Sequence, residues 1–275
     1  MPLFAGIALF CLTLLAITAE TAWAGYPSGI TVDGRPGLLT MAVPVGTLTR
    51  KLEYTLRYGL GEGDVSIRGR DVTEKKDEIW LSANARLHPH VLFVATYLST
   101  SRATTPSISG IDGITGVLAG GFHVEVPENN MAFGGSYADL SAANMQHLDL
   151  AQLEHLRHVY ITVTDKIYQD IQGYLQVKQA LSQKYTAVFP DGRRKNIPMK
   201  RAIIGTLGAE RAMKRGASLF GEAQIFDDSD FLYYGSDHYA VNLGYRMKRS
   251  RYSVEMAVRS INNSPTWYIG AAASR

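Results

Sequence analysis

Histidines and nearby carboxylates are the side chains of this 275-residue sequence that could do acid and base chemistry. Asp237 and His238 adjoin each other, close to Asp227, Asp228 and Asp230, and a carboxylate beside an imidazole can act as a general acid and base pair. This cluster leaves one alternative open, a hydrolase acting on lipid or peptide. No spacing of serine, histidine and carboxylate matches a recognisable hydrolase, so we expect no enzyme and no catalytic residue.

Two further histidines, His155 and His158, are three positions apart, and on a helix they would share a face and could bind a metal ion together. The residues that follow alternate in polarity as in a strand, which would place the two histidines on opposite faces. We therefore expect no metal site here, and nothing in the sequence predicts a cofactor.

A larger set of charged side chains occupies alternate positions within segments whose other residues are apolar. If the apolar positions face lipid, these charges face inward, because an Arg or Lys on the lipid side costs about 2 to 4 kcal/mol near the bilayer centre. We expect eight residues to line the lumen, either as a selective pore or as a plug of ion pairs: Lys51, Glu53, Arg57, Glu210, Glu222, Arg246, Glu255 and Arg259.

The elements that must position these charges are strands with a two-residue alternation. Lys51 to Leu60 alternates strictly, and the pattern returns throughout Arg201 to Ala273. Ten residues are about what a tilted strand needs to cross a bilayer. The other expected strands before the last quarter are 78–87, 91–99, 113–126, 131–140, 155–165 and 184–189. Aromatic residues near strand ends predict interface girdles: Trp80, Tyr97, Tyr137, Tyr239, Tyr252, Trp267 and Tyr268.

Long and short connections alternate along the chain, as they do in bacterial outer-membrane barrels. The long, polar ones are 61–77, 100–112, 141–154 and 227–237. Counting from both ends agrees only if Lys184 to Phe189 is a strand and Met213 to Gly216 faces the periplasm. The fold class is therefore all-β, a closed antiparallel transmembrane β-barrel of about 12 strands, with both termini periplasmic. Residues 166–183 would form a helical or irregular periplasmic connection, which either covers the barrel mouth or docks a partner.

The N-terminal residues predict export. Leu3 to Ala19 is almost wholly apolar and precedes the small residues Ala22 and Ala24, which favours a signal peptide over residues 1–24; an uncleaved anchor is the alternative. Residues 25–50 are rich in Gly and Pro and predict an irregular lead-in, and the barrel would occupy 51–275. Cys11 is the only cysteine, so the mature chain would contain none. A net charge of +3 without a basic cluster predicts no nucleic-acid partner.

Short glycine-containing motifs resemble those of YjbH-like outer-membrane proteins. They are Pro36-Gly37-Leu38-Leu39-Thr40-Met41, then Pro44-x-Gly46-Thr47-Leu48, Gly205 to Glu210, and Leu219 to Gln224 with Glu222. The resemblance covers most of the mature chain and implies a barrel linked to exopolysaccharide production or export. It carries over no catalytic residue.

Together these observations predict a non-enzymatic barrel in the bacterial outer membrane, associated with exopolysaccharide export or envelope structure. Its expected partners are outer-membrane lipid, the barrel-assembly machinery, and polysaccharide or periplasmic export proteins. The alternatives are a small-solute porin, the barrel hydrolase described above, and a soluble periplasmic β-protein.

Overall fold

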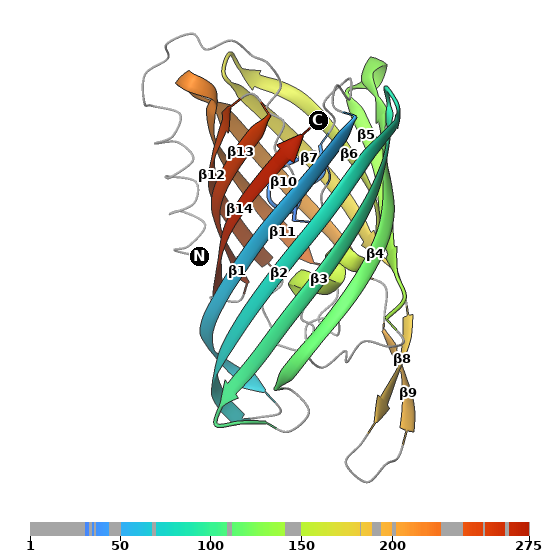
Figure 1. Cartoon of the computed structure of the whole chain (residues 1–275), viewed down its shortest axis with the longest axis vertical. Coiled ribbons are helices and arrows are strands. Elements are labelled where there is room, and N and C mark those ends of the chain that lie inside the picture. The colour runs from blue at the N-terminus through green and yellow to red at the C-terminus, as the bar shows by residue number, and fades with distance from the viewer. Residues whose placement is uncertain are drawn as a thin grey trace.

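The computed structural model describes residues 31–32, 35, 37–43, 51–67, 70–108, 112–140, 150–181, 183–188, 194–199, 202–226, 239–249, 251–261 and 264–274. Within these residues, twelve strands form a closed antiparallel barrel in the order β1-β14-β13-β12-β11-β10-β7-β6-β5-β4-β3-β2 (Figure 1). They are β1 (Leu52–Ile67), β2 (Arg70–His88), β3 (Val91–Thr105), β4 (Gly113–Val126), β5 (Met131–Ala138), β6 (His158–Tyr168), β7 (Ile171–Ala180), β10 (Ile203–Ala212), β11 (Ala217–Phe226), β12 (Tyr239–Arg249), β13 (Tyr252–Ile261) and β14 (Ser264–Ser274). The expected closed antiparallel barrel of about 12 strands is confirmed.

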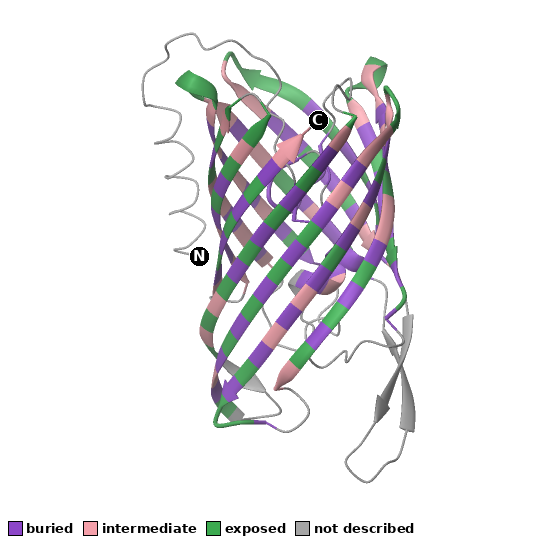
Figure 2. Cartoon of the chain, viewed as in Figure 1, coloured by how far each residue is buried: buried purple, intermediate pink, exposed green. Residues whose placement is uncertain are grey.

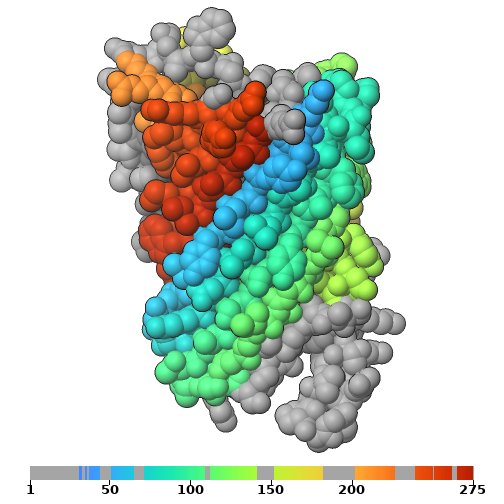
Figure 3. All heavy atoms as spheres, viewed as in Figure 1, coloured from blue at the N-terminus to red at the C-terminus, as the bar shows by residue number. Residues whose placement is uncertain are grey.

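Side chains alternate between the two faces of each strand because the chain is extended. In β1, Tyr54, Leu56 and Tyr58 are exposed, whereas Thr55 and Arg57 between them are buried. The same alternation covers the wall as bands of exposed and buried residues (Figure 2). Neighbouring strands lie side by side as a continuous outer surface (Figure 3), on which many large apolar side chains are exposed. An apolar outer surface around a buried polar inner face is typical of a membrane-embedded barrel.

Strands β1 and β14 close the barrel from opposite ends of the sequence. Their register runs from Glu53 opposite Ser274 to Gly61 opposite Thr266. Gly59 stands opposite Tyr268, and a Cβ atom at Gly59 would lie 2.7 Å from the Tyr268 ring. The absence of a side chain at Gly59 therefore makes room for an inward aromatic ring at the seam.

The connections at the two ends of the barrel differ in length. At the end that holds the start of β1 and the end of β14, few residues separate one strand from the next, after β2, β4, β6, β10 and β12. At the other end, long segments separate β3 from β4, β5 from β6, β7 from β10 and β11 from β12, while the β1 to β2 and β13 to β14 connections are short. The turn Met213 to Gly216 therefore lies at the same end as both termini of the barrel sequence.

Strands β1, β2 and β3 extend further than the alternation predicts, and much of the expected loops 61–77 and 100–112 is strand. Pairing of β1 with β2 continues past Gly61 to Ile67, which stands opposite Arg70. Here the exposed residues are polar, as at Glu62 and Asp64. Backbone hydrogen bonds hold this part of the hairpin. The alternation of apolar and polar residues seen over residues 52–60 is therefore not required here.

The expected helical or irregular connection over 166–183 is wrong, because most of it is strand β7. Gln169 and Asp170 turn the chain directly from β6 into β7, which pairs with both β6 and β10. Tyr174 faces the lumen and Leu175 faces outward, so large apolar residues occupy both faces of this strand. That placement hides the two-residue alternation in the sequence.

Residues 184–188 of the expected strand 184–189 are extended, but they do not belong to the barrel. Strands β8 (Gln183–Val188) and β9 (Arg194–Met199) form a separate two-stranded sheet beyond the barrel wall (Figure 1). The expected number of barrel strands is correct because the omission of β7 and the inclusion of β8 cancel.

The predicted aromatic girdle divides into two groups. Tyr97, Tyr137, Tyr252 and Trp267 are exposed on the outer surface and Tyr239 is half-buried, whereas Trp80 and Tyr268 are buried on the inner face. The prediction that Trp80 and Tyr268 belong to the girdle is therefore wrong. In the described part of the chain, no helix has the length and apolar character needed to span a membrane.

Candidate functional site

Two segments that are not barrel strands fill the lumen. One is the N-terminal plug, which we define as Thr31, Val32, Arg35 and residues 37–43. The other is the helix α2 (Leu150–Leu156), which belongs to the connection between β5 and β6. Leu38, Leu39 and Met41 of the plug and Leu156 of α2 are fully buried in one apolar cluster with inward residues of the wall.

The plug has a compact backbone. Gly37 pairs with Ala42 in an isolated antiparallel bridge, and Leu38 N donates to Met41 O at 3.0 Å. A Cβ atom at Gly37 would lie 2.1 Å from Met41 O, so this turn requires glycine. Residues 37–41 of the predicted irregular lead-in therefore form a turn inside the barrel.

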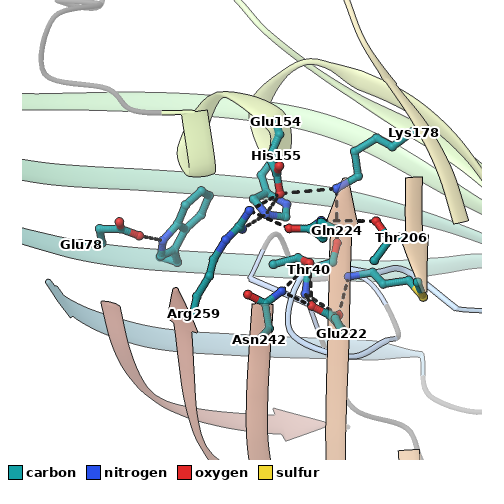
Figure 4. A network of polar contacts seen from close by, with 12 residues as sticks. Thr40, Glu78, Glu154, His155, Lys178, Thr206, Glu222, Gln224, Asn242 and Arg259 are labelled. Carbon is teal, nitrogen blue, oxygen red and sulfur yellow. Dashed lines mark hydrogen bonds and ion pairs between the residues drawn. The ribbon is translucent and has the colours of Figure 1, made fainter. Parts of the chain in front are cut away.

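Glu222 on β11 binds the tip of the plug. Its Oε1 accepts hydrogen bonds from Thr40 N and Met41 N, each at 2.9 Å, and its Oε2 accepts one from Thr40 Oγ1 at 2.7 Å (Figure 4). Asn242 on β12 donates its amide to the same carboxylate and to Thr40 Oγ1. A buried carboxylate is stabilised when several N–H groups point at it, so Glu222 and the plug satisfy each other.

Other wall side chains donate to the backbone carbonyls of the plug. Ala42 O accepts from Thr162 Oγ1 at 2.7 Å and from Gln176 Nε2 at 3.1 Å. Thr40 O accepts from Lys178 Nζ at 3.3 Å, and Gly37 O accepts from Arg246 at 3.2 Å. These contacts come from strands β6, β7 and β12, so the wall holds the plug from several directions.

Arg35 fixes the plug on a further side. Its Nη2 donates to Gly135 O on β5 at 2.5 Å, and its guanidinium lies 5.6 Å from the centre of the Tyr160 ring. The Tyr160 hydroxyl contacts His123 Nδ1 at 2.6 Å, and His123 Nε2 contacts Glu125 at the same distance.

Helix α2 carries Glu154 and His155 into a basic part of the wall. Arg259 on β13 donates to Glu154 Oε1 at 3.0 Å and to Gln224 Oε1 on β11 at 2.8 Å (Figure 4). Lys178 Nζ lies 3.9 Å from the same Glu154 oxygen. Burial acts to raise the pKa of Glu154, but the charges of Arg259 and Lys178, with the hydrogen bond to His155, outweigh it and lower the pKa. Glu154 is therefore held as an anion.

An aromatic surface faces α2 from the opposite part of the wall. The rings of Trp80 and His155 meet edge to face, with centroids 5.9 Å apart. Trp80 Nε1 donates to Glu78 at 2.8 Å, and Tyr268 donates to the same oxygen at 3.1 Å. Leu98 on β3 is buried in the same apolar cluster as Trp80 and Leu156. Helix α2 thus lies between cations on one side and rings on the other.

Four of the predicted lumen residues form an ion network within the wall itself. Glu255 on β13 contacts Arg246 at 2.5 Å and Arg57 on β1 at 2.7 Å, and Arg246 also lies 3.4 Å from Glu210. Arg246 also packs 4.8 Å from the centre of the Phe220 ring.

The structure separates the eight predicted lumen residues by role. Glu222 binds the plug, Arg259 binds α2, and Glu53 is buried on the inner face of β1. The prediction that Lys51 lines the lumen is wrong, because Lys51 precedes β1 and is exposed. Among the residues missed by the sequence argument, Lys178 was hidden by the misread strand β7, and Glu154 lay in an expected loop.

The histidine expectations have different outcomes. His155 belongs to α2 and not to a strand, and His158 begins β6; both are buried. The described residues contain no group of three or more His, Cys, Asp or Glu side chains that could hold a metal ion. Asp237, His238 and the acidic residues near them lie outside the described residues.

Comparison with known proteins bears on the fold. No family model matches the chain, and no curated protein matches it. It is similar to the COG4313 outer membrane channel from Pseudomonas putida F1, with a TM-score of 0.55 and 11% identity over 93% of this chain and 100% of that chain. It also resembles the KdgM porin (TM-score 0.46, 9% identity, 81% of this chain and 99% of that chain). At 11% identity, the likeness to the COG4313 channel shows only that the chain has an outer-membrane type of β-barrel fold.

Proposed function

We propose that this protein is a non-enzymatic channel of the bacterial outer membrane whose lumen is closed by the N-terminal plug and α2. The observation that carries the proposal is how the plug is bound. Wall side chains such as Glu222, Gln176 and Lys178 hold it largely through its backbone N–H and C=O groups. Water can replace each of these hydrogen bonds, so release of the plug would leave the polar wall groups that hold it hydrated and not unpaired.

The charge of the lumen wall supports the same proposal. Burying ionised groups in a permanently packed interior costs more than packing apolar residues of the same size. The inner face nevertheless keeps Arg57, Glu210, Arg246 and Glu255 close together. Such a lining is suited to a lumen that is filled with water when the plug and α2 are displaced.

The proposed orientation places both termini and the short turns in the periplasm, and the long connections at the outer surface. The partners proposed with it are outer-membrane lipid on the exposed apolar surface and the barrel-assembly machinery. A link to exopolysaccharide or to periplasmic export proteins stays a prediction of the YjbH-like resemblance. We favour porin-like conduction over it, because the polar wall supports a solute path without specifying a polymer.

Conductance in planar bilayers tests the channel. The unchanged chain should show rare openings, and Glu222→Gln should open more often because an amide oxygen binds Thr40 N and Met41 N more weakly than a carboxylate does. Losing charge-assisted hydrogen bonds worth about 1.5 to 3 kcal/mol predicts a rise in open probability of roughly tenfold or more.

The matched control is Glu62→Gln, which removes an exposed carboxylate at the far end of β1 and should leave the openings unchanged. Heat-modifiable gel migration would verify that each variant is folded. Silence in both the unchanged chain and Glu222→Gln would contradict a channel and favour a permanently filled barrel.

A further inference from the structure

Helix α2 occupies a place in the lumen where the wall supplies positive charge. Arg57, Arg246 and Arg102 pair with carboxylates of other wall strands, namely Glu255 and Glu74. Arg259 and Lys178 instead face a carboxylate that α2 carries in from a connection, Glu154. If α2 moves away, these wall cations lose that anion.

The fit between Arg259 and Glu154 is incomplete. Arg259 uses only Nη2 for Glu154, and its Nε is buried without a hydrogen-bond partner among the described residues. Glu154 uses only Oε1, and its Oε2 is likewise buried and unbonded in the described part of the protein. A guanidinium binds a carboxylate best through two parallel hydrogen bonds. A small carboxylate that is free to orient could use both of its oxygens on Arg259, which the helix-borne Glu154 does not.

The opposite side of the same space is apolar and aromatic. Trp80 is 1% exposed and Leu98 is 0% exposed while α2 is in place, and both would face the lumen without it. Trp80 meets the His155 ring edge to face, so α2 presents a carboxylate and a ring from adjacent residues. A solute that replaces both needs an anionic head and an apolar, preferably planar, body.

We propose that the wall surface formed by Arg259, Lys178, Gln224, Trp80 and Leu98 is a binding site for a carboxylate solute with an apolar body. Glu154 and His155 of α2 occupy this site in the absence of the solute. The inference rests on the proposed channel, since it names the class of solute that would displace α2 and pass. Arg259 binds the carboxylate, Gln224 orients Arg259, and Trp80 packs against the body.

Fluorescence of Trp80 tests the site without any measurement of current. The protein is the full chain with Trp23→Phe and Trp267→Phe, which leaves Trp80 as the only indole. The probes are benzoate, acetate and benzyl alcohol, which supply head and body together, the head alone, and the body alone. We expect benzoate to change the emission with a half-saturating concentration at least about tenfold lower than either of the others.

Variants locate the effect in the protein. Arg259→Gln should raise the half-saturating concentration of benzoate by about tenfold or more, and Arg259→Lys should lie between the two because it keeps the charge and loses the fork. Glu154→Gln should lower it, since the competing anion is gone. The control Arg102→Gln removes another buried wall arginine, which pairs with Glu74, and should leave the titration unchanged. Heat-modifiable migration shows whether each variant folds.

The outcomes separate this inference from the channel. Equal responses to benzoate and benzyl alcohol, or to benzoate and acetate, would overturn it, as would a folded Arg259→Gln that titrates like the unchanged protein. A chain that conducts but does not respond to benzoate contradicts the site alone. A chain that binds benzoate and never conducts contradicts the channel and leaves the site standing.

Discussion

Glu154 and Glu222 are both buried carboxylates in the lumen, but their partners differ in kind. Glu222 accepts hydrogen bonds from the backbone of Thr40 and Met41, so it depends on the position of a peptide segment. Glu154 is set among the charged side chains of Arg259 and Lys178, so it depends on ionisation. Removal of one is expected to affect the plug, and removal of the other to affect α2.

At this scale the pKa of Glu154 predicts how α2 responds to acid. Burial acts to raise the pKa, but Arg259, Lys178 and His155 bring it below the ordinary value of 4.5. Because the pKa of Glu154 is lower when α2 is docked, the ionised carboxylate stabilises docking at pH values above 4.5. This stabilisation is lost only as the pH falls through the lower pKa that Glu154 has in the docked state. The emission of Trp80 should therefore report release of α2 with a midpoint below pH 4.5.

Glu78 and His155 also contact Trp80, so the comparison with Glu154→Gln isolates the contribution of Glu154. That variant should lose the acid transition, and Arg259→Gln should move its midpoint upward. A transition centred at or above pH 4.5 in the unchanged protein would contradict the lowered pKa.

Strands β7 and β8 are adjacent in the sequence, but only β7 is needed to close the barrel, because β8 belongs to a separate two-stranded sheet. Val177 on β7 stands between Ile161 of β6 and Gly205 of β10, with a ladder on each side. Ala187 on β8 pairs only with Lys195 of β9 within the described sheet. A proline has no backbone N–H, so in the middle of a sheet it removes a ladder hydrogen bond, and it is found almost only on edge strands or at bulges.

We therefore expect Val177→Pro to prevent barrel closure and Ala187→Pro to leave the barrel intact. Heat-modifiable gel migration and recovery in the outer-membrane fraction measure this difference. If the two variants behaved alike, or if Ala187→Pro alone failed, the assignment of β7 to the wall would be contradicted.

Elements were predictable from the sequence where one face is apolar and the other polar. Segments such as Tyr252 to Arg259 meet this condition, because lipid and lumen impose opposite preferences on successive residues. The condition fails in β7, where Tyr174 packs inside the lumen, and in the outer part of the β1 and β2 hairpin, where the outward residues are polar as well. The predicted number of barrel strands is correct, but the sequence omits β7 from the barrel and assigns β8 to it.

The candidate site was predictable only in its wall. The inward charges follow from the alternation, which is local. The position of the plug depends on pairs such as Thr40 and Glu222, which are separated by 182 positions in the sequence. No local pattern brings such residues together, and the apolar cluster around Leu38 and Trp80 joins segments from the whole chain. The glycine turn at Gly37 was visible as a motif, but its place inside the barrel was not.

For the whole molecule, orientation in the membrane decides what each part meets. The turn at Met213 to Gly216 lies at the end that holds the start of β1 and the end of β14, and the hairpin tip beyond Glu62 lies at the opposite end. Short turns face the periplasm in outer-membrane barrels. The plug precedes β1 in the sequence and would then act from the periplasmic side, whereas α2 belongs to a connection at the opposite end of the barrel.

Single cysteines can test this orientation, because Cys11 is the only native cysteine and lies in the expected signal peptide. Asp64→Cys should react with a membrane-impermeant maleimide on intact cells, since Asp64 is exposed on the outer hairpin. Lys214→Cys is exposed in the short turn and should react only after the outer membrane is permeabilised. Both should react in detergent, which controls for reactivity. The reverse pattern on intact cells would invert the molecule, place the plug at the cell surface, and make α2 the element that meets periplasmic solutes.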